Sequence, residues 1–144
     1  MPAVYTAGYE GKSVDAFFDP LLKEGIRCIV DVRADPVSRR YGFSKRQFSE
    51  TGEKLGLGYV HMPDLGVPKE LRKNLTDDAS YQHLLDKYEH EILPEQEDAL
   101  ERLAELVKTT PSVLVCVEKD VRRCHRSRLA ETVSRRTGLD VRHL

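Results

Sequence analysis

An apolar run that stops abruptly at charged residues constrains this chain more than any other feature. Residues 113–117 are mostly β-branched and predict a strand that is buried on both faces. From Glu118 onward the side chains become charged, and Cys124, His125 and Arg126 follow within a few residues. We therefore expect a buried strand, a charged loop, and a helix that begins near Cys124.

The rest of the chain alternates short apolar runs with amphipathic segments. We expect strands at 4–7, 26–32, 57–62, 113–118 and 139–144, and helices at 13–25, 44–56, 81–92, 95–108 and 125–136. Pro20 predicts a kink or a fresh start capped by Asp19, and Ser44 with Gln47 has the spacing of a capping box. The order predicts an α/β fold, a three-layer α/β/α domain with a mainly parallel sheet of about five strands.

Composition limits the class of protein. With 144 residues, of which 40% are hydrophobic, we expect a single domain over 1–144. The formal net charge of -1 gives no general electrostatic reason for a membrane or nucleic-acid partner. Three cysteines, an odd number, indicate reduced thiols, and no signal-like or membrane-length apolar segment is seen. We expect a cytoplasmic protein, and its oligomeric state is left open.

Polar residues follow each expected strand, and in an open parallel sheet these positions meet at the edge where ligands bind. Arginines there suit a small anionic ligand, phosphorylated or nucleotide-like, because a guanidinium group holds two oxygens at once. The residues expected to bind it are Asp31, Arg33, Ser38, Arg39, His61 and Arg126. The alternative is that these charges neutralise one another as a structural ion-pair network.

The reactive groups expected at this edge are Cys124, His125 and Glu118. A cysteine at a helix N-terminus, next to basic residues, should have a lowered thiol pKa. Glu118 or Asp31 would orient arginines or act as a general base. Cys116 is expected to be buried and inert in its strand. The C-x5-R spacing from Cys116 to Arg122 is discounted, because the intervening residues contain no glycine for a tight oxyanion loop.

No metal and no cofactor are expected. The chain has no C-x2-C or H-x3-H pair, and neighbouring Cys124 and His125 are expected to point to different sides of a helix. It also has no Walker loop and no G-x-G-x-x-G after a strand.

Two alternatives come from other functional classes. The first is a nucleic-acid-binding or regulatory module without catalysis, which would use the basic segments 33–46 and 122–136 and stack bases on Tyr41 and Phe43. The second is a thiol-dependent redox or sulfur-transfer protein built on Cys124.

Several of these motifs together resemble a known family. They are Tyr5-Thr6-x-Gly8, Asp31-Val32-Arg33 with Pro36, Ser38 and Arg39, Phe43-Ser44, Tyr59-x-His61 with Leu65-Gly66, Cys116-x-Glu118 and Cys124-His125-Arg126. The combination is similar to domain-of-unknown-function family 488 and runs through nearly the whole chain. The resemblance supports the location of the site and implies no particular reaction.

Overall fold

A computed structural model describes residues 3–38 and 40–144 of the protein. Arg39, which we expect to bind an anion, lies outside the described residues.

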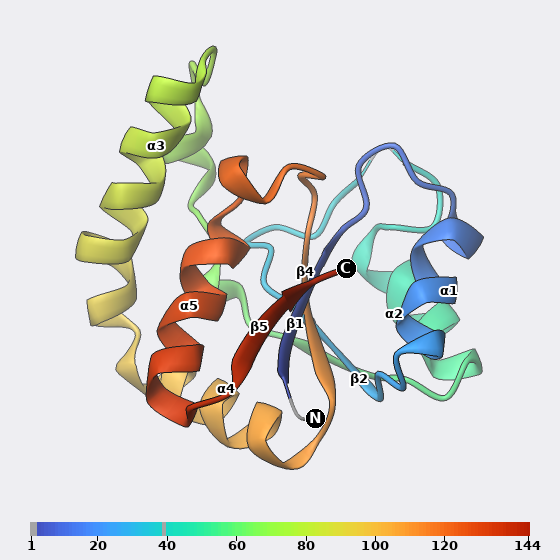
Figure 1. Cartoon of the computed structure of the whole chain (residues 1–144). Coiled ribbons are helices and arrows are strands. Elements are labelled where there is room, and N and C mark those ends of the chain that lie inside the picture. The colour runs from blue at the N-terminus through green and yellow to red at the C-terminus, as the bar shows by residue number, and fades with distance from the viewer. Residues whose placement is uncertain (1–2, 39) are drawn as a thin grey trace.

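The core of the protein is a five-stranded sheet (Figure 1). Its strands are β1 (Ala3–Gly8), β2 (Cys28–Asp31), β3 (Gly58–His61), β4 (Ser112–Cys116) and β5 (Asp140–His143). They are ordered β3-β2-β4-β1-β5, and every neighbouring pair is parallel. The predicted parallel sheet is therefore confirmed, and its central strands are β2, β4 and β1.

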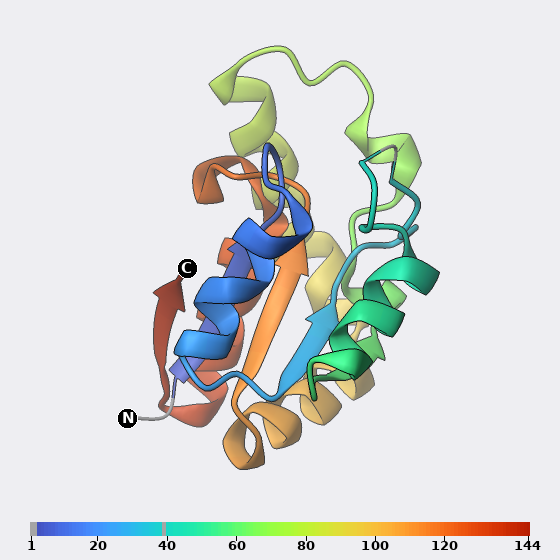
Figure 2. The ribbon, with the colours of Figure 1, turned by 90° about the vertical axis from the view of Figure 1, so that its right-hand side faces the viewer.

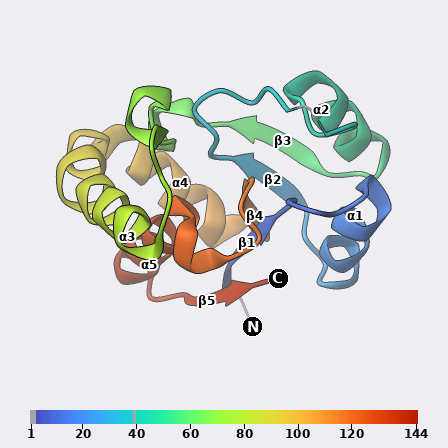
Figure 3. The same ribbon diagram turned by 90° about the horizontal axis from the view of Figure 1, so that it is seen from above.

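Helices cover both faces of this sheet. They are α1 (Val14–Lys23), α2 (Lys45–Lys54), α3 (Asp78–Lys87), α4 (Glu97–Thr109) and α5 (His125–Thr137). Figure 3 shows α1 and α2 on one face and α3, α4 and α5 on the other, which confirms the three-layer α/β/α prediction. Between α3 and α4 the chain continues through a π-helical turn (Tyr88–Ile92) and a 3-10 turn (Leu93–Glu95).

Alternation along the strands builds two cores. Val30 and Leu114 pack into the core under α4 and α5, whereas Ile29 and Val113 pack into the core under α1 and α2. All four side chains are fully buried. Successive residues of a strand point to opposite faces, so strands covered on both sides must be apolar throughout.

Pro20 does not break the first helix. α1 runs without interruption from Val14 to Lys23, with Ser13 as its N-cap. The expected fresh start capped by Asp19 is therefore wrong. Proline deprives the carbonyl of Ala16 of its helical partner, but Ala16 and Pro20 are both exposed, so water can take the place of the lost donor.

The predicted capping box at Ser44 is also wrong, although α2 begins where expected. Ser44 makes no side-chain cap hydrogen bond. Its Oγ instead accepts from the backbone N–H of Ser38 at 2.9 Å, and Gln47 Oε1 accepts from the N–H of Gly42 at 3.0 Å. Both residues use their hydrogen bonds to shape the preceding loop.

Within the described residues, no helix has both the length and the apolar run required to span a bilayer.

Candidate functional site

The carboxyl ends of the strands form one edge, where polar side chains gather. Figure 2 shows β2 and β4 ending side by side at this edge, and α5 begins next to it. The loops that follow β2 and β4 also meet there, because His125 Nε2 lies 2.9 Å from the carbonyl oxygen of Val32. Ligands of open parallel sheets bind at this kind of edge.

Asp31 and Arg33 form a buried ion pair at the end of β2. Arg33 Nε donates to Asp31 Oδ1 at 2.8 Å and Nη2 donates to Oδ2 at 2.6 Å. Tyr59 also donates its hydroxyl to Asp31, while Arg33 Nη1 donates to the Tyr9 hydroxyl at 3.1 Å and to the Phe43 carbonyl at 2.5 Å. Asp31 is fully buried and Arg33 is 4% exposed. For these two residues the structure shows the alternative interpretation, a structural ion pair.

Arg126 is likewise an internal side chain, with 1% of its surface exposed. Its Nε donates to Thr6 Oγ1 at 3.3 Å, and its Nη groups donate to the carbonyls of Glu118 and Lys119. A Cβ on Gly8 would lie only 2.0 Å from the Glu118 carbonyl oxygen. Arg126 thus holds the loop after β4 against the end of β1, and the loop can approach so closely because residue 8 is glycine. Each of the three nitrogens of the guanidinium group therefore has an internal partner.

Ser38 and His61 also make internal contacts. Ser38 Oγ accepts from the backbone N–H of Arg40 at 3.1 Å, within its own loop. His61 Nε2 lies 2.8 Å from the carbonyl oxygen of Arg33, which can only accept, so His61 donates this bond. Their expected roles as ligand contacts stay predictions, and each side chain already has a local partner.

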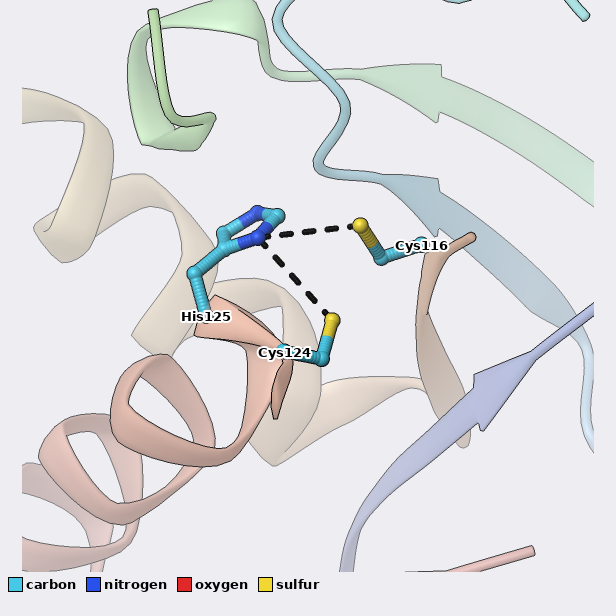
Figure 4. A group of neighbouring side chains, drawn as sticks. All are labelled: Cys116, Cys124 and His125. Atoms are coloured by element: carbon cyan, nitrogen blue, oxygen red, sulfur yellow. Dashed lines mark hydrogen bonds between the residues drawn. The ribbon is translucent and has the colours of Figure 1, made fainter. Parts of the chain in front are cut away.

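Cys116, Cys124 and His125 form a compact buried cluster (Figure 4). His125 Nδ1 lies 3.6 Å from Cys116 Sγ and 4.0 Å from Cys124 Sγ. Cys116 is buried, as expected, and it contacts His125 in this cluster. The expectation that Cys124 and His125 point to different sides of a helix is wrong.

The backbone at Cys124 and at Cys116 explains why the two cysteine side chains meet at His125. Cys124 is the N-cap of α5, with extended backbone angles of φ -121° and ψ 135°, so helical periodicity does not set the direction of its side chain. Cys116 is the last residue of β4, at the carboxyl edge of the sheet.

The imidazole of His125 is held in one orientation. The Val32 carbonyl oxygen can only accept a hydrogen bond, so Nε2 must carry the proton, and the lone pair of a neutral ring is then on Nδ1. The ring of Tyr88 packs edge-on against the imidazole, with centroids 5.2 Å apart. The fold therefore directs the Nδ1 atom at the two thiols.

The four titratable groups of this region shift one another. Burial raises the pKa of Cys124, but contacts with Cys116 and His125 outweigh burial and hold it well below its ordinary value. Contact with Cys124 and burial raise the pKa of Cys116 well above the usual range. Burial lowers the pKa of His125, but contact with Cys124 outweighs it and the net shift is upward. Burial and the nearby Cys124 charge raise the pKa of Glu118.

Glu118 has an unusual partner for a carboxylate. Its Oε2 lies 3.4 Å from Cys116 Sγ. Among the described residues its side chain forms no ion pair, although it is half-buried. A thiol is a weak hydrogen-bond donor. The Glu118 carboxyl group therefore has weaker hydrogen-bond partners than Asp31, which accepts from Arg33 and Tyr59.

A narrow crevice opens beside this cluster. Its enclosed volume is about 20 Å³, room for roughly one water molecule. The polar and ionisable residues that line it are Arg33, Arg72, Tyr81, Cys116, Glu118, Arg123 and His125. Of the residues expected to be catalytic, His125 and Glu118 reach the crevice wall, whereas Cys124 does not line it.

Sequence reasoning did not single out the outer wall of the crevice. Arg72 and Tyr81 come from a charged stretch and from α3, which carry no motif. Arg123 donates to Asp78 at 2.7 Å and lies 4.9 Å from the centre of the Tyr81 ring. In the sequence, the feature that could have pointed to Cys116 as a site residue is its spacing of two from Glu118, Cys116-x-Glu118.

Tyr41 and Phe43, the two side chains suggested for base stacking, differ in solvent exposure. Phe43 is fully buried and stacks on Tyr9, with ring centroids 4.5 Å apart, so its expected role in nucleic-acid binding is wrong. Tyr41 is 81% exposed.

No curated protein and no solved structure matches the chain. A family model described as "Domain of unknown function DUF488" matches residues 13–133. Because this match spans most of the chain, the protein belongs to the DUF488 family.

Proposed function

We propose that this protein is an enzyme that acts on a small anionic molecule bound over the mouth of the crevice at the carboxyl edge of the sheet. The observation that carries the proposal is the contact of Cys116 with Glu118 at 3.4 Å and with His125 at 3.6 Å, at the wall of the crevice. A thiol, a carboxyl group and an imidazole are the groups that proteins use as nucleophiles and as general acids or bases.

The arrangement is hard to explain by stability alone. Elsewhere the fold satisfies a buried carboxylate with a bidentate arginine and a tyrosine, as it does for Asp31. Among the described residues, the Glu118 carboxyl group at the same edge of the sheet has only a thiol, a weak donor, as its partner. Partly buried polar groups that lack strong partners are costly. Such a cost is typical of residues retained for chemistry.

The charge of the crevice supports an anionic ligand. Arg33, Arg72 and Arg123 lie on its wall with Glu118, and outside the crevice Arg33 is paired with Asp31 and Arg123 with Asp78. Arg72 makes no side-chain hydrogen bond or ion pair with the described residues. A guanidinium group binds phosphate or carboxylate oxygens in pairs. Arg72 and Arg123 replace Arg33 and Arg126 as the groups proposed to hold the anion.

Binding is tested by calorimetric titration of inorganic phosphate, sulfate, citrate and adenosine monophosphate. Loss of one charged hydrogen bond costs about 1.5–3 kcal/mol, so we expect Arg72→Ala and Arg123→Ala to weaken binding by about 10–100-fold. Arg136→Ala is the matched control, because Arg136 forms a similar pair with Glu97 at 2.6 Å and does not line the crevice. Equal affinities in all four proteins would refute the anion site.

Catalysis is tested by incubating the protein with pooled phosphorylated and carboxylated metabolites and following the mixture by mass spectrometry. We expect the wild-type protein to consume a compound that Glu118→Gln leaves intact. If Glu118→Gln retains the full conversion rate, Glu118 has no part in the reaction.

A thiol-dependent redox or sulfur-transfer reaction is the second candidate. It is favoured by the two cysteine sulfurs, which lie within 4.8 Å of each other and of the imidazole nitrogen. Oxidised glutathione would convert the Cys116 and Cys124 thiols into a disulfide, with release of two reduced glutathione molecules. The expected readout is loss of two hydrogen masses, mapped by proteolysis to these cysteines. Stable mixed disulfides or no reaction would argue against this candidate.

A further inference from the structure

Three side chains at the base of the crevice offer soft ligand atoms at one point. Cys116 Sγ, Cys124 Sγ and a nitrogen of His125 all lie within 4.8 Å of one another. Figure 4 shows both sulfurs approaching the same ring nitrogen, one from the end of β4 and one from the N-cap of α5. The chain places them there from different elements, so no short sequence motif announces them.

The distances fit a tetrahedral ion. Zinc lies about 2.3 Å from thiolate sulfur and about 2.0–2.1 Å from imidazole nitrogen, which separates sulfur from nitrogen by about 3.6 Å and sulfur from sulfur by about 3.8 Å. The observed separations from His125 Nδ1 are 3.6 Å to Cys116 and 4.0 Å to Cys124. The nitrogen–sulfur distances therefore need to change by no more than about 0.4 Å, and the two sulfurs lie within 4.8 Å of each other.

The outer contacts of His125 fit a metal ligand as well. Its Nε2 donates to the Val32 carbonyl at 2.9 Å, which leaves the Nδ1 lone pair directed at the sulfurs. Metal-bound histidines almost always donate their second ring nitrogen to a carbonyl or carboxylate in this way. Two thiolates would also cancel the charge of a divalent ion, so the buried centre would carry no net charge.

We propose that Cys116, Cys124 and His125 bind one zinc-class divalent ion. Thiolate and imidazole ligands select zinc over magnesium or calcium. Cys116 and His125 line the crevice and Glu118 contacts Cys116, so we place the fourth coordination position on the crevice side, near Glu118. Three protein ligands with one open position are typical of catalytic zinc sites, in which the ion activates water or polarises a bound oxygen.

The catalytic part of this inference rests on the proposed function, but metal binding does not require any substrate. Arg72→Ala and Arg123→Ala should bind metal as the wild type does, because neither residue contributes a ligand atom. The proposal of an anion site and the proposal of a metal site can therefore be refuted independently.

The test is titration of the reduced, chelator-treated full chain with Co²⁺ and Zn²⁺. We expect one equivalent of Co²⁺ to bind, with a thiolate charge-transfer band and the strong visible absorption of tetrahedral cobalt, and to be displaced by Zn²⁺. Loss of a residue that only supports a metal ligand lowers metal affinity by roughly 10–100-fold. Loss of a ligand itself should cost more, so we expect Cys116→Ser, Cys124→Ser and His125→Gln each to lower Co²⁺ affinity by about 100-fold or more. Metal content of the protein as purified is measured in parallel.

Cys28→Ala is the matched control, because Cys28 is a buried cysteine of β2 outside the cluster. It should bind Co²⁺ with wild-type stoichiometry. Each variant is checked for folding by circular dichroism in chelator. The charge-transfer band per bound ion should also weaken in Cys116→Ser, a change that reduced folding alone would not produce.

Failure of the wild type to bind one equivalent of Co²⁺ or Zn²⁺ at micromolar concentration would overturn the proposal. So would equal losses in Cys28→Ala and Cys116→Ser. Formation of a Cys116–Cys124 disulfide at the same rate with and without Zn²⁺ would also overturn it, and would favour the redox candidate.

Discussion

His125 donates its Nε2 proton to the backbone carbonyl of Val32 across 2.9 Å. This bond joins the first residue of α5 to Val32, the residue that follows β2, across more than ninety residues of sequence. It also decides which ring nitrogen faces the thiols. The orientation of the site and the contact between the two loops therefore depend on the same side chain.

Removal of the His125 side chain should destabilise the fold even without metal. His125→Ala leaves the buried carbonyl of Val32 without this donor, which should lower the free energy of unfolding by about 1–3 kcal/mol. Urea unfolding in chelator measures this change. His83→Ala is the control, because His83 is exposed on α3. Equal stability of the two variants would mean that water replaces the His125 bond at no cost.

Disruption of the buried ion pair should have a larger effect. Arg33→Met leaves the buried Asp31 carboxylate without its bidentate partner, and loss of one partner of a buried pair costs about 3–5 kcal/mol. The double variant with Asp31→Leu should be less destabilised than the sum of the two single variants, because no unpaired charge remains. Denaturant unfolding of the four proteins forms the cycle. Additive effects would contradict a strong interaction.

The exposed pair of Arg46 and Glu50 provides a control for the cycle. It joins side chains that are 91% and 56% exposed, so Arg46→Met should change stability little.

A methyl group at Gly8 should disturb the loop after β4. Its carbon would overlap the carbonyl oxygen of Glu118 at 2.0 Å, so the loop must move. We expect Gly8→Ala to lower the free energy of unfolding by about 1–3 kcal/mol, the usual range for overpacking. Gly58→Ala is the matched control, because its nearest neighbour would be 3.7 Å away. Comparable stability of both variants would show that the loop yields easily.

The stability of the protein should fall at mildly acidic pH through His143. Burial and the charge of Arg126 lower the pKa of this imidazole, whose Nδ1 lies 2.6 Å from Thr6 Oγ1. The unfolded chain then binds the proton more readily, so this contribution is present above the ordinary pKa of about 6.5 and is lost as pH falls through the lowered folded value.

The measurement is the free energy of unfolding at pH values from about 7.5 to 5, compared with His143→Gln. The variant should show the shallower decline, because it lacks this titrating group. Parallel curves for the two proteins would contradict the assignment to His143.

Much of the fold could be predicted from the sequence because its signals are local. The apolar run at 113–117 corresponds to β4, and Gly138 ends α5 with a positive φ of 77° as a helix-terminating glycine should. Sequence patterns that predict a particular hydrogen bond were less reliable, because the folded chain can offer the same side chain another partner. Ser44 has the sequence of a cap but bonds to Ser38 instead, because the folded loop brings a better placed N–H within reach.

The amino-acid sequence by itself determined the alternation of strands and helices, the parallel sheet, and the edge at which polar residues gather. These follow from periodicity and chain direction, which are properties of neighbouring residues. Only the tertiary structure decided which polar groups are internal. Arg33 and Arg126 are used by buried partners, whereas Cys116 joins Cys124 and His125. Side-chain direction at a strand end and at an N-cap depends on long-range packing, which local sequence patterns do not encode.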